Sequence, residues 1–322
     1  MKRHNAFFIA FILLMLIAAM MPGCSKTEKH ETGKISIVCT IFPLYDWTRQ
    51  ILGSQEENYD MTFLLSNNID LHNYQPSVDD MVKISSCDLF IYVGGESDRW
   101  AADALREVAN PDMAAISMLE RLGAAAKMEE SAEGMEDDGD EEEAGLDEHV
   151  WLSLRNAAVL CGAIADALVS LDPSNAAEYR GNLVEYTVKL LALDAEYQEI
   201  VSAAPVKTLM FGDRFPFRYL MDDYGLRYYA AFPGCSAETE ASFNTVVFLA
   251  GKADELGLGT VMVTESADQT IARTIISNTK RKDQQILVLD SMQSTTAGDV
   301  RDGTTYLSIM KGNLDALEKA LQ

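Results

Sequence analysis

Residues 175–203 read NAAEYRGNLVEYTVKLLALDAEYQEIVSA, and this stretch decides the fold. It contains no proline and only one glycine, and its apolar residues recur at the spacing of one helix face. These residues are Leu183, Tyr186, Leu190, Leu193 and Tyr197. Asp172-Pro173-Ser174 supplies a start signal and Pro205 a stop signal. A helix of this length would be roughly 40 Å long, enough to span a small domain. We therefore predict that residues 173–204 form one long rigid helix that joins two lobes.

Apolar, β-branched runs alternate with amphipathic segments on both sides of that helix. The runs expected as strands are 35–41, 61–65, 89–93, 208–211, 228–230, 260–264 and 286–289. The segments expected as helices include 46–52, 99–108, 243–256 and 271–280. Alternating strands and helices pack as parallel sheets covered by helices. The sequence therefore predicts an α/β fold of two lobes, each a mostly parallel β-sheet flanked by helices, at 35–172 and 205–322.

The start of the chain indicates where the protein is located. Two basic residues precede an apolar run at 6–21, and Pro22-Gly23-Cys24-Ser25 follows it. A charged start, an apolar run and a small residue before a cleavage point form an export signal. The Gly-Cys pair resembles the cleavage site of a bacterial lipoprotein. We expect a signal peptide at 1–23, lipidation of Cys24, a tether at 24–34 and an extracytoplasmic protein anchored by lipid to the bacterial cell membrane. The alternative is an uncleaved anchor helix, for which the apolar run is short.

The chain is acidic, with a formal net charge of −24 that becomes −26 without the two basic residues of the leader. This charge argues against nucleic acid and against an anionic membrane surface as partners, and it is compatible with collecting cations. Twelve acidic residues and no basic one fall between Glu129 and Glu148. We therefore expect a disordered surface loop at 127–148. It is either a plain solubilising loop or a weak antenna that collects cations next to His149.

Two histidines within the predicted lobes stand in similar short motifs. His72 lies in Leu71-His72-Asn73-Tyr74-Gln75-Pro76, and His149 lies in Asp147-Glu148-His149-Val150-Trp151-Leu152. A neutral imidazole is the commonest protein ligand for zinc and similar metals. A single histidine is more often structural, but two histidines in similar contexts favour one metal ion clasped between the lobes.

Further ligands are needed, because a tight site for such a metal has four or more at about 2.0–2.2 Å. Asp213, Glu265 and Asp290 are candidates, since each follows a predicted strand and ligands gather at the carboxyl ends of strands in open α/β sheets. Cys235 lies in a turn and is a candidate ligand or reactive thiol. Three other cysteines lie in apolar runs, where buried thiols are expected. They are Cys39, Cys87 and Cys161.

Several motifs, in the same order, resemble those of the zinc/manganese solute-binding lipoproteins of ABC importers, the cluster A-I group. The resemblance covers almost the whole chain after the leader. Besides the two histidine motifs, it is carried by Ile41-Phe42-Pro43, Ser86-Cys87-Asp88-Leu89, Trp100, Phe217-Arg218-Tyr219-Leu220, Tyr224-Gly225-Leu226, the segment 236–242 and Glu265. The resemblance implies a metal in the cleft between two lobes. It implies His72 and His149 as the first two ligands and Asp290 as the fourth.

The chain departs from that family at the third ligand. The family has a histidine or glutamate three residues before its Phe-x-Tyr motif, and this position is Arg214, which offers no lone pair. Asp213, Glu240, Cys235 or a water molecule could replace it. Alternatively, Arg214 pairs with a site carboxylate and weakens binding, or recognises an anionic group on a chelated metal. A site of two imidazoles and a carboxylate tolerates zinc, manganese or iron.

The leading hypothesis is a monomeric receptor without catalytic activity. It would capture a divalent metal ion, Zn²⁺ first and Mn²⁺ next, and deliver it to the membrane permease of an ABC importer. The alternatives are a surface adhesin with a structural metal and an exported metallohydrolase. Against the hydrolase, the sequence has no nucleophile elbow, no His-Glu-x-x-His helix and no Gly-rich phosphate loop. The long helix should limit hinge motion, so metal release would depend on local shifts of loops and ligands.

Overall fold

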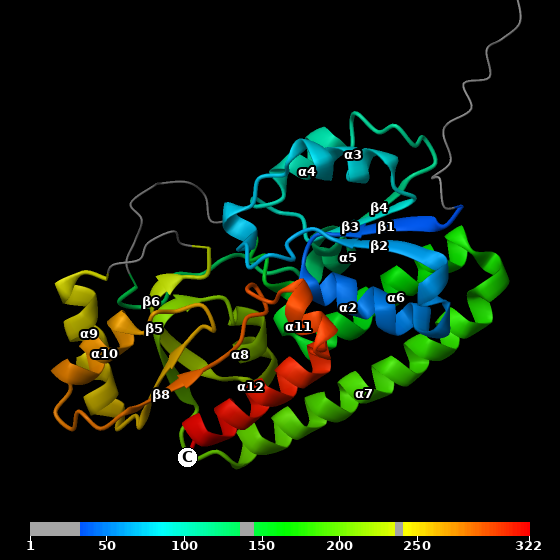
Figure 1. Ribbon diagram of the computed structural model, residues 1–322. Coiled ribbons are helices and arrows are strands. Elements are labelled where there is room, and N and C mark those ends of the chain that lie inside the picture. The colour runs from blue at the N-terminus through cyan, green and yellow to red at the C-terminus, as the bar shows by residue number, and fades with distance from the viewer. Residues whose placement is uncertain (1–32, 136–144, 236–240) are drawn as a thin grey trace, which may run out of the picture. The chain divides into compact units, whose positions relative to one another are not determined.

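Two four-stranded parallel sheets form the cores of the two lobes in the computed structural model, which describes residues 33–135, 145–235 and 241–322 (Figure 1). The first sheet has the order β2-β1-β3-β4 and consists of β1 (Ile35–Cys39), β2 (Tyr59–Phe63), β3 (Leu89–Tyr92) and β4 (Ala114–Ser117). The second has the order β6-β5-β7-β8 and consists of β5 (Thr208–Phe215), β6 (Arg227–Pro233), β7 (Thr260–Val263) and β8 (Gln285–Val288). Strand pairing is parallel throughout both sheets.

Helices connect the strands and cover the sheets. The first lobe contains α2 (Phe42–Leu52), α3 (Val78–Ser86), α4 (Arg99–Ala104), α5 (Met118–Leu122) and α6 (Leu154–Leu171). The second contains α8 (Arg218–Tyr224), α9 (Phe243–Leu256), α10 (Thr270–Asn278), α11 (Ala297–Arg301) and α12 (Tyr306–Ala320). By length and composition alone α6 could cross a membrane, but its buried face packs against α2 and α7.

The long helix α7 (Ala176–Ala203) follows a 3-10 turn at Pro173–Asn175. Its buried residues are Tyr179, Tyr186, Leu190, Leu193, Tyr197 and Val201. It packs on α2 and α6 of the first lobe and on α8 and α12 of the second (Figure 1). The predicted α/β fold, with two sheets and one long connecting helix, is confirmed.

The strand predictions erred in both lobes: they missed β4 in the first, and in the second β5 and β6 extend beyond the predicted 208–211 and 228–230. β4 was not predicted, because Ala114-Ala115-Ile116-Ser117 holds only one β-branched apolar residue; the segment pairs with the buried strand β3. The helix predicted at 99–108 ends at Ala104, and the helix predicted to begin at residue 46 begins at Phe42. The latter has Pro43 in its first turn, a position that proline favours.

The acidic segment is ordered at both ends, so the prediction of a disordered loop over 127–148 is wrong there. Met128 and Leu146 form an antiparallel bridge, and the backbone N–H of Asp147 donates to the carbonyl of Lys127 at 2.8 Å. Asp147 and Glu148 are buried. Residues 136–144, the predicted signal peptide, the predicted lipidation site Cys24 and most of the predicted tether lie outside the described residues.

Candidate metal centre

His72 is held by the short turn in which it lies. It belongs to a 3-10 turn (Leu71–Asn73), and its backbone N–H donates to Oδ1 of Asp70 at 3.0 Å, which caps the turn. Its Nδ1 lies 2.8 Å from the Ser97 hydroxyl, in the loop that follows β3. Its ring is largely buried, and burial, together with the nearby His149, lowers the pKa of His72 to about 3. The ring is therefore neutral, as a metal ligand must be.

His149 is held in the same way by an aspartate two residues before it. Its backbone N–H and its Nδ1 both contact Oδ1 of Asp147, at 2.9 and 3.0 Å. The side chain is fully buried, and Trp151 packs beside it with ring centroids 5.3 Å apart. Although burial opposes protonation, the hydrogen bond and charge of Asp147 raise the pKa of His149. Because the carboxylate accepts from Nδ1–H, the lone pair of the neutral ring is on Nε2.

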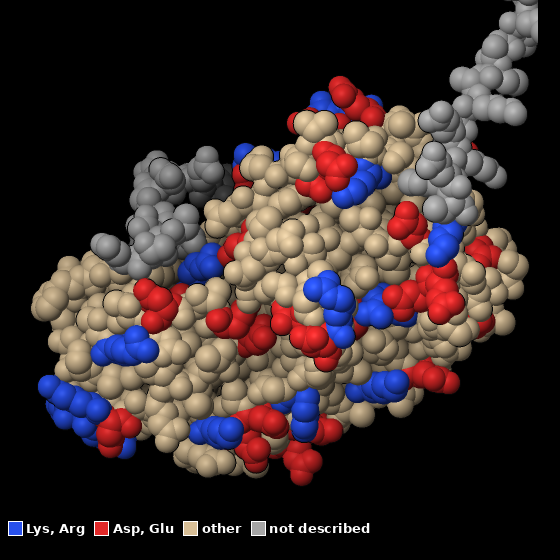
Figure 2. All heavy atoms as spheres, in the orientation of Figure 1, with Lys and Arg blue, Asp and Glu red and all other residues tan. Residues whose placement is uncertain are grey.

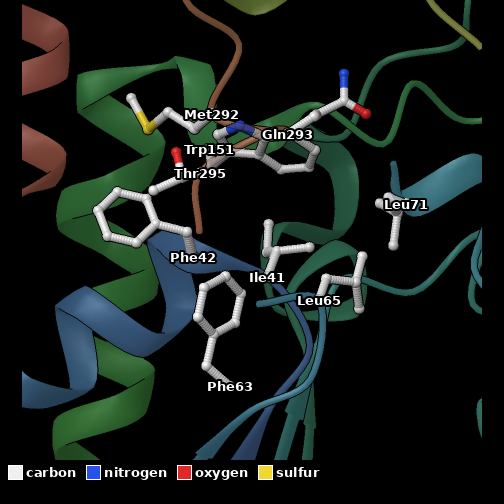
Figure 3. A pocket seen from close by; sticks show the side chains of 9 residues that line it. All are labelled: Ile41, Phe42, Phe63, Leu65, Leu71, Trp151, Met292, Gln293 and Thr295. Atoms are coloured by element: carbon white, nitrogen blue, oxygen red, sulfur yellow. The ribbon is translucent and has the colours of Figure 1, made fainter. Parts of the chain in front are cut away.

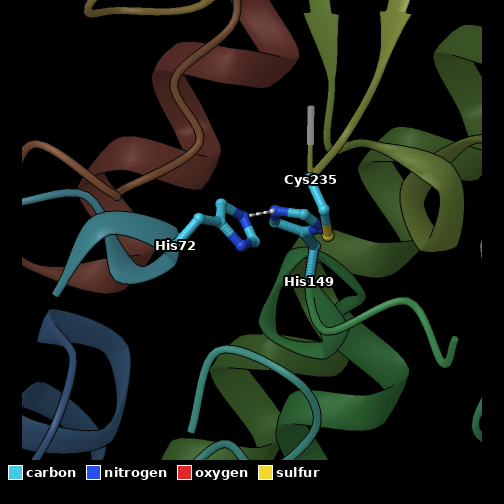
Figure 4. Close-up of side chains that lie close together, drawn as sticks. All are labelled: His72, His149 and Cys235. Carbon is cyan, nitrogen blue, oxygen red and sulfur yellow. Dashed lines mark hydrogen bonds between the residues drawn. The ribbon is translucent and has the colours of Figure 1, made fainter. Parts of the chain in front are cut away.

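The two histidine rings meet edge to edge through their Nε2 atoms, which lie 3.1 Å apart (Figure 4). Two nitrogens bound to one tetrahedral zinc at about 2.0–2.1 Å would be roughly 3.3 Å apart. The contact is a hydrogen bond when one nitrogen carries a proton. When both Nδ1 atoms donate to their own partners, two lone pairs face one another, and a cation between them removes the repulsion.

Cys235 completes the cluster from the second lobe. It follows β6, and its Sγ and the ligand nitrogens of His72 and His149 all lie within 4.8 Å of one another (Figure 4). Among the described residues, this is the His/Cys/Asp/Glu group close enough to share one ion. Gly234 allows the approach, because a Cβ there would lie 2.9 Å from the carbonyl oxygen of Phe215 and 3.0 Å from Cε1 of His149.

Carboxylates surround this group. Glu148 is 1% exposed; its Oε1 accepts from the backbone N–H of Ser97 at 2.8 Å, and its Oε2 lies 3.7 Å from Nδ1 of His72 without a hydrogen-bond partner. Glu129 accepts from the backbone N–H of Cys235 at 3.0 Å. Burial and these two carboxylates raise the pKa of the Cys235 thiol. Burial also raises the pKa of Glu148, and a bound cation would favour the ionised form of both groups.

Acidic and basic side chains are interspersed on the face of the molecule that Figure 2 shows. Figure 2 shows small mixed groups of acidic and basic side chains separated by uncharged surface. That face therefore has no single acidic patch among the residues that the structure describes.

Arg214 forms an ion pair with Asp70 of the first lobe. Its Nη2 donates to Oδ2 of Asp70 at 2.8 Å, and both side chains are about four-fifths buried. The opposite oxygen of the same carboxylate caps the turn of His72. Of the alternatives that the sequence left open, this geometry matches the pairing of Arg214 with a carboxylate at the site.

Asp213 and Asp290, which the sequence suggested as ligands, are absent from the described group of ligand atoms. Asp213 accepts from the backbone N–H and the hydroxyl of Thr264. Asp290 accepts from the backbone N–H of Met292 at 2.7 Å; burial, with the nearby Glu265, raises its pKa to about 7. Glu265 itself accepts from backbone N–H groups at 291, 293 and 294, and so it shapes the loop after β8. Glu240 lies outside the described residues.

Sequence reasoning missed the residues that orient the histidines. Asp70 and Asp147 each stand two residues before a histidine and bond to its backbone, so the repeated Asp-x-His pattern was a signal for them. Ser97 and Glu148 gave no such signal, because tertiary packing alone brings them to His72.

A small, largely apolar cavity lies close to the centre (Figure 3). It is lined by Ile41, Phe42, Phe63, Leu65, Leu71, Trp151, Met292, Gln293 and Thr295. Leu71 and Trp151 are near neighbours in sequence of the two histidines, and Met292 and Gln293 come from the loop after β8.

Comparisons with known proteins agree with a metal centre. The sequence profile of a family described as zinc-uptake complex component A, periplasmic, matches residues 37–320. The zinc-binding lipoprotein AdcA of Streptococcus pneumoniae serotype 4 is 30% identical over 314 residues, which cover 97% of this chain and 60% of that protein. The high-affinity zinc uptake system protein ZnuA of Bacillus subtilis is 27% identical over 321 residues, which cover 99% of this chain and 98% of that protein.

The fold is similar to that of a solved zinc complex. The crystal structure of the Zn(II)-bound ZnuA-like domain of Streptococcus pneumoniae AdcA matches with a TM-score of 0.69 and 27% identity, over 90% of this chain and 99% of that one. The chain therefore spans a domain of AdcA, about three fifths of its length, and nearly the whole of ZnuA.

Proposed function

The chain belongs to the zinc-uptake complex component A family, and from this membership we propose that it captures zinc outside the cytoplasm and delivers it to the permease of an ABC importer. One observation carries the proposal: the Nε2 atoms of His72 and His149 face one another at 3.1 Å, with each Nδ1 held by another group. The two Nε2 atoms are thus already placed to bind one cation. The zinc-named relatives favour zinc over manganese as the cargo.

His72 and His149 are the first two proposed ligands. Asp290 is proposed as an oxygen ligand only after a shift of the loop that follows β8, because it now accepts from Met292. Asp213 would have to give up two bonds to Thr264, so it is the weaker candidate. The turns that carry the histidines need no rearrangement.

Lipidation of Cys24 would anchor the chain to the cell membrane beside the permease. The chain would act as a monomer, and it would bind and release zinc without catalysing a reaction, as expected of a transport component.

Titration calorimetry of the purified protein with zinc and manganese tests the binding function. We expect one zinc per chain, and we expect His72→Ala and His149→Ala each to weaken zinc binding by at least about 100-fold, since loss of even an outer partner of a metal site costs 10–100-fold. His30→Ala, which removes the other histidine after the leader, is the matched control and should bind zinc like the wild type.

Uptake can be tested in cells that depend on this protein for growth in zinc-limited medium. The wild-type chain and His30→Ala should restore growth, and His72→Ala should not. Wild-type zinc affinity in a His72→Ala, His149→Ala double variant would overturn the proposal, as would metal-dependent turnover of esters or peptides that is lost in His149→Ala.

A further inference from the structure

We infer that the Cys235 thiolate is the third zinc ligand, so that the site is a His₂Cys centre selective for zinc over manganese. The inference rests on the proposed zinc-binding function and adds a ligand from the second lobe. Its geometric basis is the group of His72, His149 and Cys235, in which each ligand atom lies within 4.8 Å of the others.

The position of Cys235 is a consequence of the second sheet. β6 pairs in parallel with β5, so the residue after β6 emerges at the carboxyl edge of the sheet, where ligands gather. Gly234 then lets the backbone pass against His149, where a side chain would collide with the ring and with the carbonyl of Phe215. The thiol is thereby placed against the two imidazoles.

The separation of the sulfur from the nitrogens suits a shared ion. At bond lengths of about 2.3 Å to sulfur and 2.0–2.1 Å to nitrogen, tetrahedral zinc would set S···N near roughly 3.6 Å. The ligand atoms lie within 4.8 Å of one another, so the sulfur is at most about 1.2 Å farther from the nitrogens than tetrahedral zinc requires. Cys235 is a free thiol, so no disulfide competes for the sulfur.

A second observation points to a cation at this place. Glu148 is almost fully buried, yet its Oε2 has no hydrogen-bond partner and faces His72 at 3.7 Å. A Cβ on Gly95 would lie 2.4 Å from the other oxygen of Glu148, so the glycine makes room for this carboxylate. Burial of an unsatisfied carboxylate is costly unless positive charge is near it.

Arg214 keeps one first-lobe carboxylate, that of Asp70, from serving as a hard oxygen ligand. Asp70 is the nearest acidic neighbour of His72 in the sequence, but its carboxylate is held by Arg214 and by the backbone of His72. The ion therefore meets two imidazoles and a thiolate. Soft sulfur ligands select zinc, whereas manganese prefers oxygen ligands. Zinc binding forms a Zn–S bond, breaks the S–H bond and releases the proton to solvent.

Cobalt(II) substitution tests the assignment directly. The full chain carries Cys24→Ser, so that the lipidation cysteine contributes no thiol. Cobalt bound to the wild-type site should show a sulfur-to-cobalt charge-transfer band in the near ultraviolet. Cys235→Ser should lose the band, and Cys161→Ala, which alters a buried thiol of α6, should keep it.

Affinity measurements supply an independent readout. Cys235→Ser should weaken zinc binding by about 100-fold while leaving manganese binding nearly unchanged, so that the preference for zinc falls by the same factor. Zinc bound by the wild type with no charge-transfer band in the cobalt form would overturn the Cys235 assignment and leave the proposed function standing. Failure of the wild type to bind zinc would instead defeat the proposed function.

Discussion

Asp147 decides which nitrogen of His149 is available to a metal. Its Oδ1 accepts from Nδ1 of the ring and from the backbone N–H of the same residue. The carboxylate thereby holds the tautomer, orients the ring and increases the basicity of Nε2.

Asp147→Asn should therefore weaken zinc binding by about 10–100-fold, because an amide can stabilise the wrong tautomer and carries no charge. Calorimetry measures the loss, and unchanged thermal stability of the metal-free variant would show that the fold is intact. Wild-type affinity in this variant would mean that the orientation of His149 does not depend on Asp147.

Some residues of the site could be predicted from sequence and others could not. His72 and His149 could be singled out because their motifs are local. Cys235 could be named only as one alternative among several, since its approach to the histidines depends on the end of β6 and on Gly234. The partner of Arg214 could not be identified, because Asp70 lies 144 residues away in the chain.

Among the elements, α7 contains one internal glycine with space around it. A Cβ on Gly181 would meet no atom within 4 Å, and the residue lies inside a helix of 28 residues. Glycine in a helix interior costs about 0.5–1 kcal/mol relative to alanine.

Gly181→Ala should raise the free energy of unfolding by about 0.5–1 kcal/mol, measured by urea denaturation. Gly257→Ala is the matched contrast. Gly257 ends α9 with a φ of 65°, a left-handed conformation in which alanine is strained, so this variant should lose about 1 kcal/mol. If both variants changed the free energy of unfolding equally, the backbone conformation of the two glycines would not explain the effects.

The loop before α4 carries a buried carboxylate that affects stability as the pH changes. Oδ2 of Asp98 accepts from the backbone N–H groups of Val93 and Gly94, while its Oδ1 has no partner. Burial, with a further contribution from Glu148, raises the pKa of Asp98 to about 7. The folded state thus binds this proton more tightly than the unfolded state, and stability is lost as pH rises through the folded pKa.

Asp98→Asn should remove that loss. The free energy of unfolding of Asp98→Asn minus that of the wild type should increase by at most about 2–3 kcal/mol from pH 5 to pH 8, because only the wild type loses stability over this range. Denaturant titrations of both proteins at several pH values measure the difference. A difference that does not change with pH would show that Asp98 stays ionised in the folded protein.

The element pattern was more predictable than the site. Local sequence sets the spacing of apolar residues in α7 and the alternation of strands with helices. Both could therefore be predicted. β4 could not be predicted, because its residues have no strong preference for a strand. It is a strand because it pairs with β3.

At the scale of the whole molecule, several links join the lobes besides α7. The indole N–H of Trp151 donates to the carbonyl of Ser291 at 2.9 Å, and the hydroxyl of Tyr306 donates to the carbonyl of Trp151 at 2.7 Å. The backbone N–H of Tyr306 donates to Asp46 at 3.0 Å. These buried bonds tie the start of α12 and the loop after β8 to the first lobe.

Zinc release should therefore proceed without a large rotation of the lobes. Small-angle X-ray scattering of the protein with zinc and with a chelator should give the same radius of gyration within error. Hydrogen exchange should show faster exchange without zinc at residues near 72, 149 and 235, and no change along α7. A clear increase in the radius on chelation would contradict this expectation.

The order of the ligands along the chain has a consequence for biosynthesis. His72 and His149 precede α7, whereas Cys235 follows it. In the proposed export of the chain, His72 and His149 would cross the membrane before α7, and Cys235 would cross only after it. In the proposed centre, tight binding of zinc would therefore begin only when the second half has folded, and incomplete chains would leave zinc free in the envelope.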